Sequence, residues 1–370
     1  MIRDMTIRRP ISILASVVAG ALTLATGASA QIPLTPPTTE APAAAKPAVK
    51  AAPKPPVAAK KPAPPAAAAL PPTGATVTAK PMPDDPNVDL VYGAYQRGQY
   101  KTAFDLASAR AQAGDPKAMT MLGELYSNAL GIKRDYAKAV DWYKRAADAG
   151  DREAMFALAM MRIAGRGGPL DKQEGVKLLA SSAKLGEPKA AYNLALLYLD
   201  GQTLPQDLRR SAELLRMAAD AGNAEGQDAL ATFYKEGTGV EKDAEKAVRL
   251  LQAATLADNV DAEVEYAIAL YNGTGTPKNE PAAVALLRKA ARQNSPIAQN
   301  RLAFVLATGR GAPMDKVEAL KWHLIAKTAG KGDPMLDEAL ADLSPEDRAK
   351  AEEAARRWLG AGATAATAAK

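Results

Sequence analysis

The sequence predicts an all-α protein, an α-solenoid built from tandem helical hairpins. The first observation behind this prediction is a repeat of 36 residues that runs over 115–330 without an insertion. Self-similarity at a fixed period of this size is the signature of a solenoid. The second observation is composition, because alanine is abundant while aromatic residues make up only 5% of the chain. Small side chains favour helices that pack closely together.

Each unit of the repeat begins with a residue that suits the start of a helix. The six units start at Asp115, Asp151, Glu187, Asn223, Asn259 and Ser295. Asp, Asn and Ser are good N-caps and Glu a poorer one, and proline follows in three units, where its missing N–H is harmless. A large residue followed by a small one, as in Leu122-Gly123, then predicts the core-facing side of the first helix.

A glycine-bearing loop and a second helix complete the unit. Pairs such as Gly237/Gly239 lie between two predicted helices, so we interpret them as turns and not as phosphate-binding loops, which follow a strand. Ala129 and Thr203 replace loop glycines, and altered turns are expected there. The second helices are predicted to begin after Asp135, Asp171, Asp207, Asp243, Asn279 and Asp315. With a glutamate three residues later, Asp171 and Asp315 also predict capping boxes.

These motifs resemble the Sel-one-like repeat family, a relative of the tetratricopeptide repeat. The shared pattern is A-x₃-L-G/A, a G-x-G loop, D-x₃-A-x₂-W/L and A-A-x₂-G. The resemblance implies a superhelix of hairpins that acts as a scaffold in signalling and envelope regulation. Arg162 departs from the pattern, because other units have tyrosine at its position.

The N-terminal residues 1–30 predict a signal peptide. Three arginines precede an uncharged apolar run, and Ala28-Ser29-Ala30 places small residues before a cleavage site. We predict cleavage after Ala30 and export to the periplasm. The alternative is an uncleaved N-terminal helix that anchors the chain in the inner membrane.

Residues 31–86 are predicted to be a disordered, extended linker, since they hold 16 of the 27 prolines. The basic charge of the chain is concentrated here: residues 31–83 carry six lysines against Glu40, whereas residues 84–370 have 38 basic and 39 acidic side chains. A nucleic-acid partner is therefore not expected. The lysines are dispersed, which favours an inert linker, with weak contact to cell wall or anionic lipid as the alternative.

Both ends of the array are predicted to be caps, as a solenoid requires. Residues 87–114 predict an N-terminal capping hairpin with Gly98 in its loop, and residues 331–359 predict C-terminal capping helices that end near Trp358. Residues 360–370 are rich in alanine, threonine and glycine and are expected to form a disordered tail.

The residues offer no constellation for catalysis. Without cysteine, and with His323 as the single histidine, disulfides, thiolate chemistry and His-pair metal sites are excluded. We interpret His323 as a structural residue, and spacing assigns no carboxylate beside it. The protein is predicted not to be an enzyme and to hold no cofactor or metal. A penicillin-binding or hydrolase-type enzyme is the least favoured reading, because the cysteines of the penicillin-binding branch of the family are missing.

The predicted binding site is the concave face of the superhelix, placed on the first helices by analogy with tetratricopeptide arrays. Two apolar patches flank a polar middle at Asp228, Thr232 and Lys235. The patches consist of Phe156, Met160, Ile163, Tyr192, Leu196 and Leu199 on one side and of Val264, Ile268, Tyr271 and Phe304 on the other. Exposed apolar residues on a concave surface indicate a binding site, while packing between adjacent repeats is the alternative interpretation.

The leading hypothesis is a non-catalytic scaffold of the cell envelope that binds a protein or peptide on this face. It predicts that changing Phe156 and Leu196 to aspartate removes binding and leaves stability nearly unchanged. The alternative is a cell-wall-associated structural factor retained through the proline- and lysine-rich linker. The identity of the partner and the oligomeric state stay open at this point.

Overall fold

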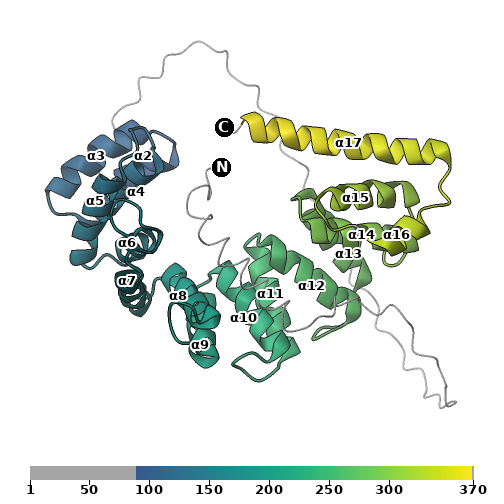
Figure 1. The fold of residues 1–370 in the computed structure, drawn as a ribbon, viewed down its shortest axis with the longest axis horizontal. Coiled ribbons are helices and arrows are strands. Elements are labelled where there is room, and N and C mark those ends of the chain that lie inside the picture. The colour runs from purple at the N-terminus through teal and green to yellow at the C-terminus, as the bar shows by residue number, and fades with distance from the viewer. Residues whose placement is uncertain (1–88, 369–370) are drawn as a thin grey trace, which may run out of the picture. The chain divides into compact units, whose positions relative to one another are not determined.

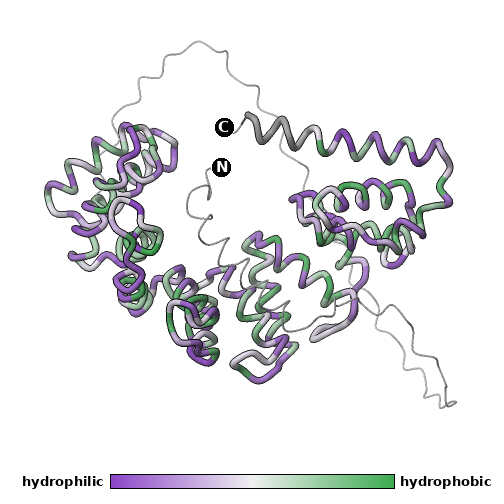
Figure 2. Tube along the Cα trace, viewed as in Figure 1, coloured by the Kyte–Doolittle hydropathy of each residue, from purple (hydrophilic) through white to green (hydrophobic). Residues whose placement is uncertain are grey.

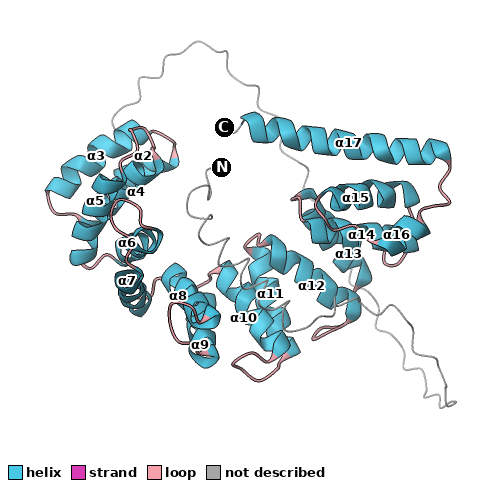
Figure 3. Cartoon of the chain, viewed as in Figure 1, coloured by secondary structure: helices cyan, strands magenta, loops and turns pink. Residues whose placement is uncertain are grey.

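The structure is a computed structural model that describes residues 89–368, with side chains as far as Gly360. The described residues form sixteen helices and no strand (Figure 3). The prediction of an all-α solenoid is therefore confirmed. The predicted signal peptide at 1–30 and the linker at 31–86 lie outside the described residues.

Every repeat contributes two helices of 13 residues each, and the helices follow one another in chain order (Figure 1). The first helices of the six repeats are α4 Pro116–Asn128, α6 Arg152–Ala164, α8 Pro188–Asp200, α10 Ala224–Glu236, α12 Val260–Asn272 and α14 Pro296–Thr308. The second helices are α5 Tyr136–Asp148, α7 Lys172–Lys184, α9 Leu208–Asp220, α11 Ala244–Leu256, α13 Glu280–Arg292 and α15 Lys316–Thr328.

The helices begin where the sequence places their caps. All twelve predicted N-cap side chains accept a hydrogen bond from a backbone N–H of the first turn, the weaker cap Glu187 included. The predicted capping boxes are only half formed. Asp171 accepts from the backbone N–H of Glu174 at 2.9 Å, but its own N–H donates to the carbonyl of Arg162. The loop therefore satisfies the donor that a capping box would have used.

Left-handed residues end the helices. Ala129 has φ +59°, within the same region as Gly165 and Gly237, which hold its place in other repeats. The altered turn predicted at Ala129 is therefore wrong, because alanine adopts the strained conformation that glycine adopts freely elsewhere. Asp258 and Asn294 take the left-handed position after their second helices, where other repeats have glycine.

The core is continuous from one repeat to the next. Each second helix packs on the first helix of its own repeat and on that of the following repeat. Apolar and polar stretches alternate along the helices (Figure 2), as expected when one side of each helix is buried. Leu179 and Leu215 are fully buried, and both belong to one cluster that spans several repeats. Neighbouring hairpins thus bury each other's apolar sides.

Additional helices cover both ends of the repeats. At the N-terminus, α2 Leu90–Gln96 and α3 Tyr100–Gln112 form the predicted short hairpin, with Gly98 at φ +72° between them. At the C-terminus, α16 Pro334–Ala339 is followed by α17 Pro345–Ala368, which packs on α15. The prediction of a disordered tail from residue 360 is wrong up to Ala368. The alanine-rich segment continues α17, because alanine is the best helix former.

Candidate functional site

The structure buries half of the residues predicted to form the binding surface. Five of them are at most 9% exposed, namely Phe156, Met160, Leu196, Val264 and Tyr271. The other five are only partly buried, namely Ile163, Tyr192, Leu199, Ile268 and Phe304. The expectation of exposed apolar patches is therefore wrong for the five buried side chains, whereas the role of this face in binding stays a prediction.

The reason lies in the packing between adjacent repeats. Phe156 and Met160 belong to a core cluster that includes residues of α7 and α8, and Tyr192 and Leu199 of α8 pack against that cluster. Position along one helix does not show how closely the neighbouring repeat approaches. Phe156 and Met160 therefore belong to the core and not to an exposed patch.

The side chains that the first helices expose to solvent are mainly charged. One position of the first helix is exposed in all six repeats, and we call the surface around it the first-helix face. It holds Lys117, Glu153, Lys189, Glu225, Asp261 and Ile297. The Lys117 ammonium lies 3.5 Å from Asp151 and 3.8 Å from Glu153, so charge is balanced at the first repeats. Towards repeats four and five the face becomes acidic.

Four carboxylates gather there, and we call Glu225, Asp228, Asp261 and Glu265 the acidic cluster. Lys235 lies 3.0 Å from Glu265, and its positive charge also acts on Asp228, but one cation does not balance four carboxylates. Burial raises the pKa of Asp228 to about 7, and the negative charges of Asp261 and Glu265 add to the shift. The folded chain thus holds this proton more tightly than the unfolded chain, so ionisation of Asp228 lowers stability as the pH rises towards 7.

Tyr192 is a predicted site residue that lies close to the acidic cluster. Burial raises the pKa of Tyr192 to about 12, and Glu225, Asp228 and Asp261 contribute through their negative charge. The sequence held a signal for this site, since acidic residues recur at equivalent positions of two consecutive repeats. The predicted polar middle includes Asp228 of this cluster but not Glu225, Asp261 or Glu265. Strongly perturbed carboxyl groups of this kind are concentrated at functional sites.

His323 has a structural role at the C-terminal end of the array. Its side chain is fully buried on α15, and its Nε2 lies 2.8 Å from a carboxylate oxygen of Asp337 on α16. Lys327 also donates to Asp337 at 3.0 Å, and these two partners hold the pKa of Asp337 below its ordinary value. The carboxylate partner that spacing did not assign is therefore Asp337, and the pair fastens α16 to the last repeat.

Two further findings concern only the part of the chain that the structure describes. Within it, no group of three or more His, Asp or Glu side chains is arranged to hold a metal ion. Among the same residues, no helix has both the length and the apolar character needed to cross a membrane.

Stacked hairpins that bury their apolar sides and present a charged face define an α-helical repeat array, a class that works through its surface. The chain belongs to the Sel1 repeat family. The family model, described as Sel1 repeat, matches six consecutive segments at 116–151, 152–187, 188–223, 224–259, 260–295 and 296–331. The resemblance noted from the motifs is thus confirmed. Sel1 repeat proteins generally act as non-enzymatic scaffolds that bind other proteins.

Solved structures of similar proteins agree with this assignment. A Sel1 repeat protein from Oxalobacter formigenes is 28% identical with a TM-score of 0.59, and the similarity covers 65% of this chain and 98% of that one. The protective antigen c5321 of uropathogenic Escherichia coli, which displays an SLR fold, is 26% identical with a TM-score of 0.50. That similarity covers 70% of this chain and 64% of the antigen. No curated protein matches the chain.

Proposed function

We propose that this protein is a non-catalytic scaffold of the cell envelope that binds a protein or peptide partner on its first-helix face. The acidic cluster is the observation that carries the proposal. Its carboxylates repel one another, and Asp228 has no hydrogen-bonding partner among the described residues. This repulsion and the burial of Asp228 cost the free protein free energy, and a bound cationic partner would reduce that cost. A partner segment with lysine or arginine side chains fits this charge.

The family supports the scaffold part of the proposal, since Sel1 repeat proteins generally bind protein partners. The location rests on the N-terminal sequence, where a positive segment, an apolar run and Ala28-Ser29-Ala30 form the pattern of a signal peptide. Export to the periplasm follows from cleavage after Ala30, and retention at the inner membrane follows if the segment is left in place.

A cell-wall-associated structural factor is the second candidate. It is favoured by one observation, the lysines of residues 31–86, which would meet the anionic polymers of a cell wall. In that case the repeats would take no part in binding, and retention at the cell wall would depend on the linker. The scaffold therefore does not need residues 31–86 to bind its partner, whereas the structural factor needs them for retention at the cell wall.

We expect a variant that lacks residues 31–86 to capture the same envelope protein as the full chain, because the scaffold binds through its repeats. The measurement is crosslinking and affinity capture from the cell envelope, followed by mass spectrometry, with the linker alone as the control. Loss of capture together with loss of cell-wall retention in the deletion variant would favour the structural factor. Failure of the full chain to capture any specific protein would contradict the scaffold.

A further inference from the structure

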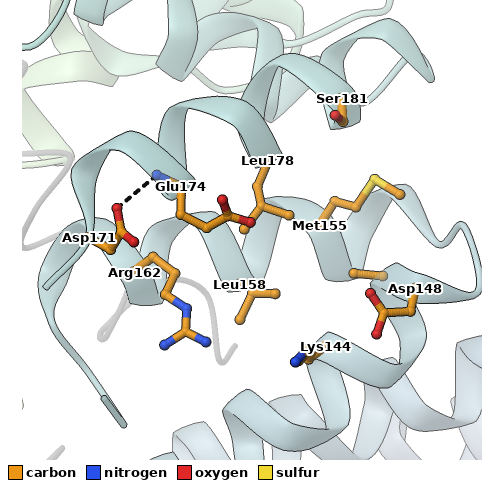
Figure 4. A pocket seen from close by; sticks show the side chains of 10 residues that line it. Lys144, Asp148, Met155, Leu158, Arg162, Asp171, Glu174, Leu178 and Ser181 are labelled. Carbon is orange, nitrogen blue, oxygen red and sulfur yellow. Dashed lines mark hydrogen bonds between the residues drawn. The ribbon is translucent and has the colours of Figure 1, made fainter. Parts of the chain in front are cut away.

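A second surface feature lies where α5, α6 and α7 meet. A groove of about 560 Å³ runs between α5 and α7 and over α6 (Figure 4). Its apolar lining consists of Ala147, Met155, Leu158 and Leu178, and six polar or charged side chains complete it. A volume of this size lies within the range of ligand sites.

Two cations line the same groove without a partner. Figure 4 places the Lys144 ammonium and the Arg162 guanidinium on the same side, with Leu158 between them. Neither side chain makes a hydrogen bond or an ion pair to any other described residue. Lys144 is exposed and Arg162 partly buried, so both donors are open to an acceptor from outside the chain.

Equivalent positions in repeats three and four show how this groove is closed elsewhere. Arg216 stands 72 residues after Lys144, and Tyr234 stands 72 residues after Arg162. The Arg216 guanidinium donates to the Tyr234 hydroxyl at 3.0 Å, so the cation has an acceptor within the chain. In repeat two, Arg162 holds the position of that tyrosine. It adds a second hydrogen-bond donor to the groove, where the tyrosine hydroxyl would have been an acceptor.

Repeats five and six close the groove in a different way. Arg288, the equivalent of Lys144, donates to both carboxylate oxygens of Glu318 at 3.0 Å. The indole N–H of Trp322 donates to the same carboxylate at 3.2 Å and holds it in place. The equivalents of these two residues are Glu174 and Leu178. Leucine cannot orient a carboxylate.

Glu174 lines the same groove, and Figure 4 shows its carboxylate beside Leu178. It lies 4.0 Å from Lys177 on its own helix and forms no ion pair with Lys144 or Arg162. Arg216 and Arg288 therefore each have an acceptor within the chain, whereas Lys144, at the equivalent position, has none. An anionic group from outside the chain can take the vacant role of acceptor.

We propose that the groove between α5 and α7 binds a peptide segment in which an acidic residue adjoins an aliphatic one. The carboxylate lies between Lys144 and Arg162, and the aliphatic side chain rests on Leu158 and Leu178. This inference rests on the proposed scaffold function, to which it adds a second docking surface where α5, α6 and α7 meet. Asp148, Asp171 and Glu174 also line the groove and disfavour a segment with several adjacent carboxylates.

The test uses two probes, an acetylated and amidated tripeptide of leucine, glutamate and leucine, and the same tripeptide with glutamine in the middle. Methyl NMR of the full chain should show shifts at Leu158, Leu178 and Met155 with the glutamate peptide. The glutamine peptide should bind about tenfold more weakly, because it lacks the charge-assisted hydrogen bonds.

Arg162→Tyr is the informative variant, because tyrosine holds this position in three other repeats and is compatible with the fold. We expect it to supply an acceptor for Lys144 and to reduce binding of the glutamate peptide about tenfold. Lys184→Gln, an exposed cation of α7 outside the groove, is the matched control and should bind as the unchanged chain does. Equal binding of the two peptides, no shift at Leu158 and Leu178, or unchanged binding by Arg162→Tyr would overturn the proposal.

Capture from the cell envelope separates this inference from the proposed function. If the full chain captures a protein but binds neither peptide, the groove proposal is wrong and the scaffold stands. If the glutamate peptide binds as expected and no envelope protein is captured, the groove proposal stands and the scaffold fails.

Discussion

Leu196→Asp is expected to unfold the central repeats at ordinary temperature. Leu196 is 1% exposed, so an aspartate there would be a buried, unpaired charge. The substitution also removes the burial of a leucine side chain. Together these losses should amount to more than about 4 kcal/mol, which is at the upper end of what single substitutions cause.

The matched control for this prediction is Met217→Asp on α9, where the side chain is 44% exposed. We expect that variant to stay within about 1 kcal/mol of the unchanged protein. Urea denaturation followed by far-UV circular dichroism measures both effects. A Leu196→Asp protein with unchanged stability would restore the original expectation that this residue, like Phe156, belongs to an exposed binding patch.

Gly239→Ala is expected to have the second largest effect. Gly239 has φ +65°, and a Cβ there would lie against the carbonyl oxygen of Leu208, at the start of the preceding repeat's second helix, well inside van der Waals contact. Gly167 and Gly275 meet the carbonyls of Tyr136 and Ala244 in the same way. The substitution combines a left-handed backbone with a backbone clash and should cost about 3 kcal/mol or more.

Gly222→Ala isolates the conformational part of that cost. Gly222 also has a left-handed backbone, with φ +81°, but no atom lies within 4 Å of an added Cβ. We expect it to lose about 1 kcal/mol. Thermal unfolding of the two variants compares them directly, and equal losses would mean that the second loop glycine has no role in the contact between repeats.

The fold could be predicted from the sequence because its determinants are local and repeat in phase. N-caps such as Asp207 and left-handed helix ends such as Gly237 each depend on a few neighbouring residues, and the 36-residue period places them in register. The G-x-G loops were interpreted as turns. The structure adds that the second glycine also permits the close approach of the preceding repeat, which a single unit does not reveal.

The binding face was harder to predict, because exposure depends on how far apart neighbouring helices lie. Leu196 and Val264 have the pattern of surface residues on an isolated helix and are buried in the folded array. The pKa of Asp228 depends on charges from α12 as well as its own helix. The groove at Lys144 and Arg162 becomes visible only when three repeats are compared at the level of side-chain contacts.

The claim that the first-helix face binds a cationic partner is tested most directly by reversing its charge. Glu225 and Asp261 are both exposed, so Glu225→Lys with Asp261→Lys should leave unfolding unchanged and reduce partner capture by at least about tenfold. Asp141→Lys with Asp220→Lys makes the same change of charge on exposed positions of second helices, and capture should persist. If the first variant captured its partner as well as the second, the first-helix face would not be the binding surface.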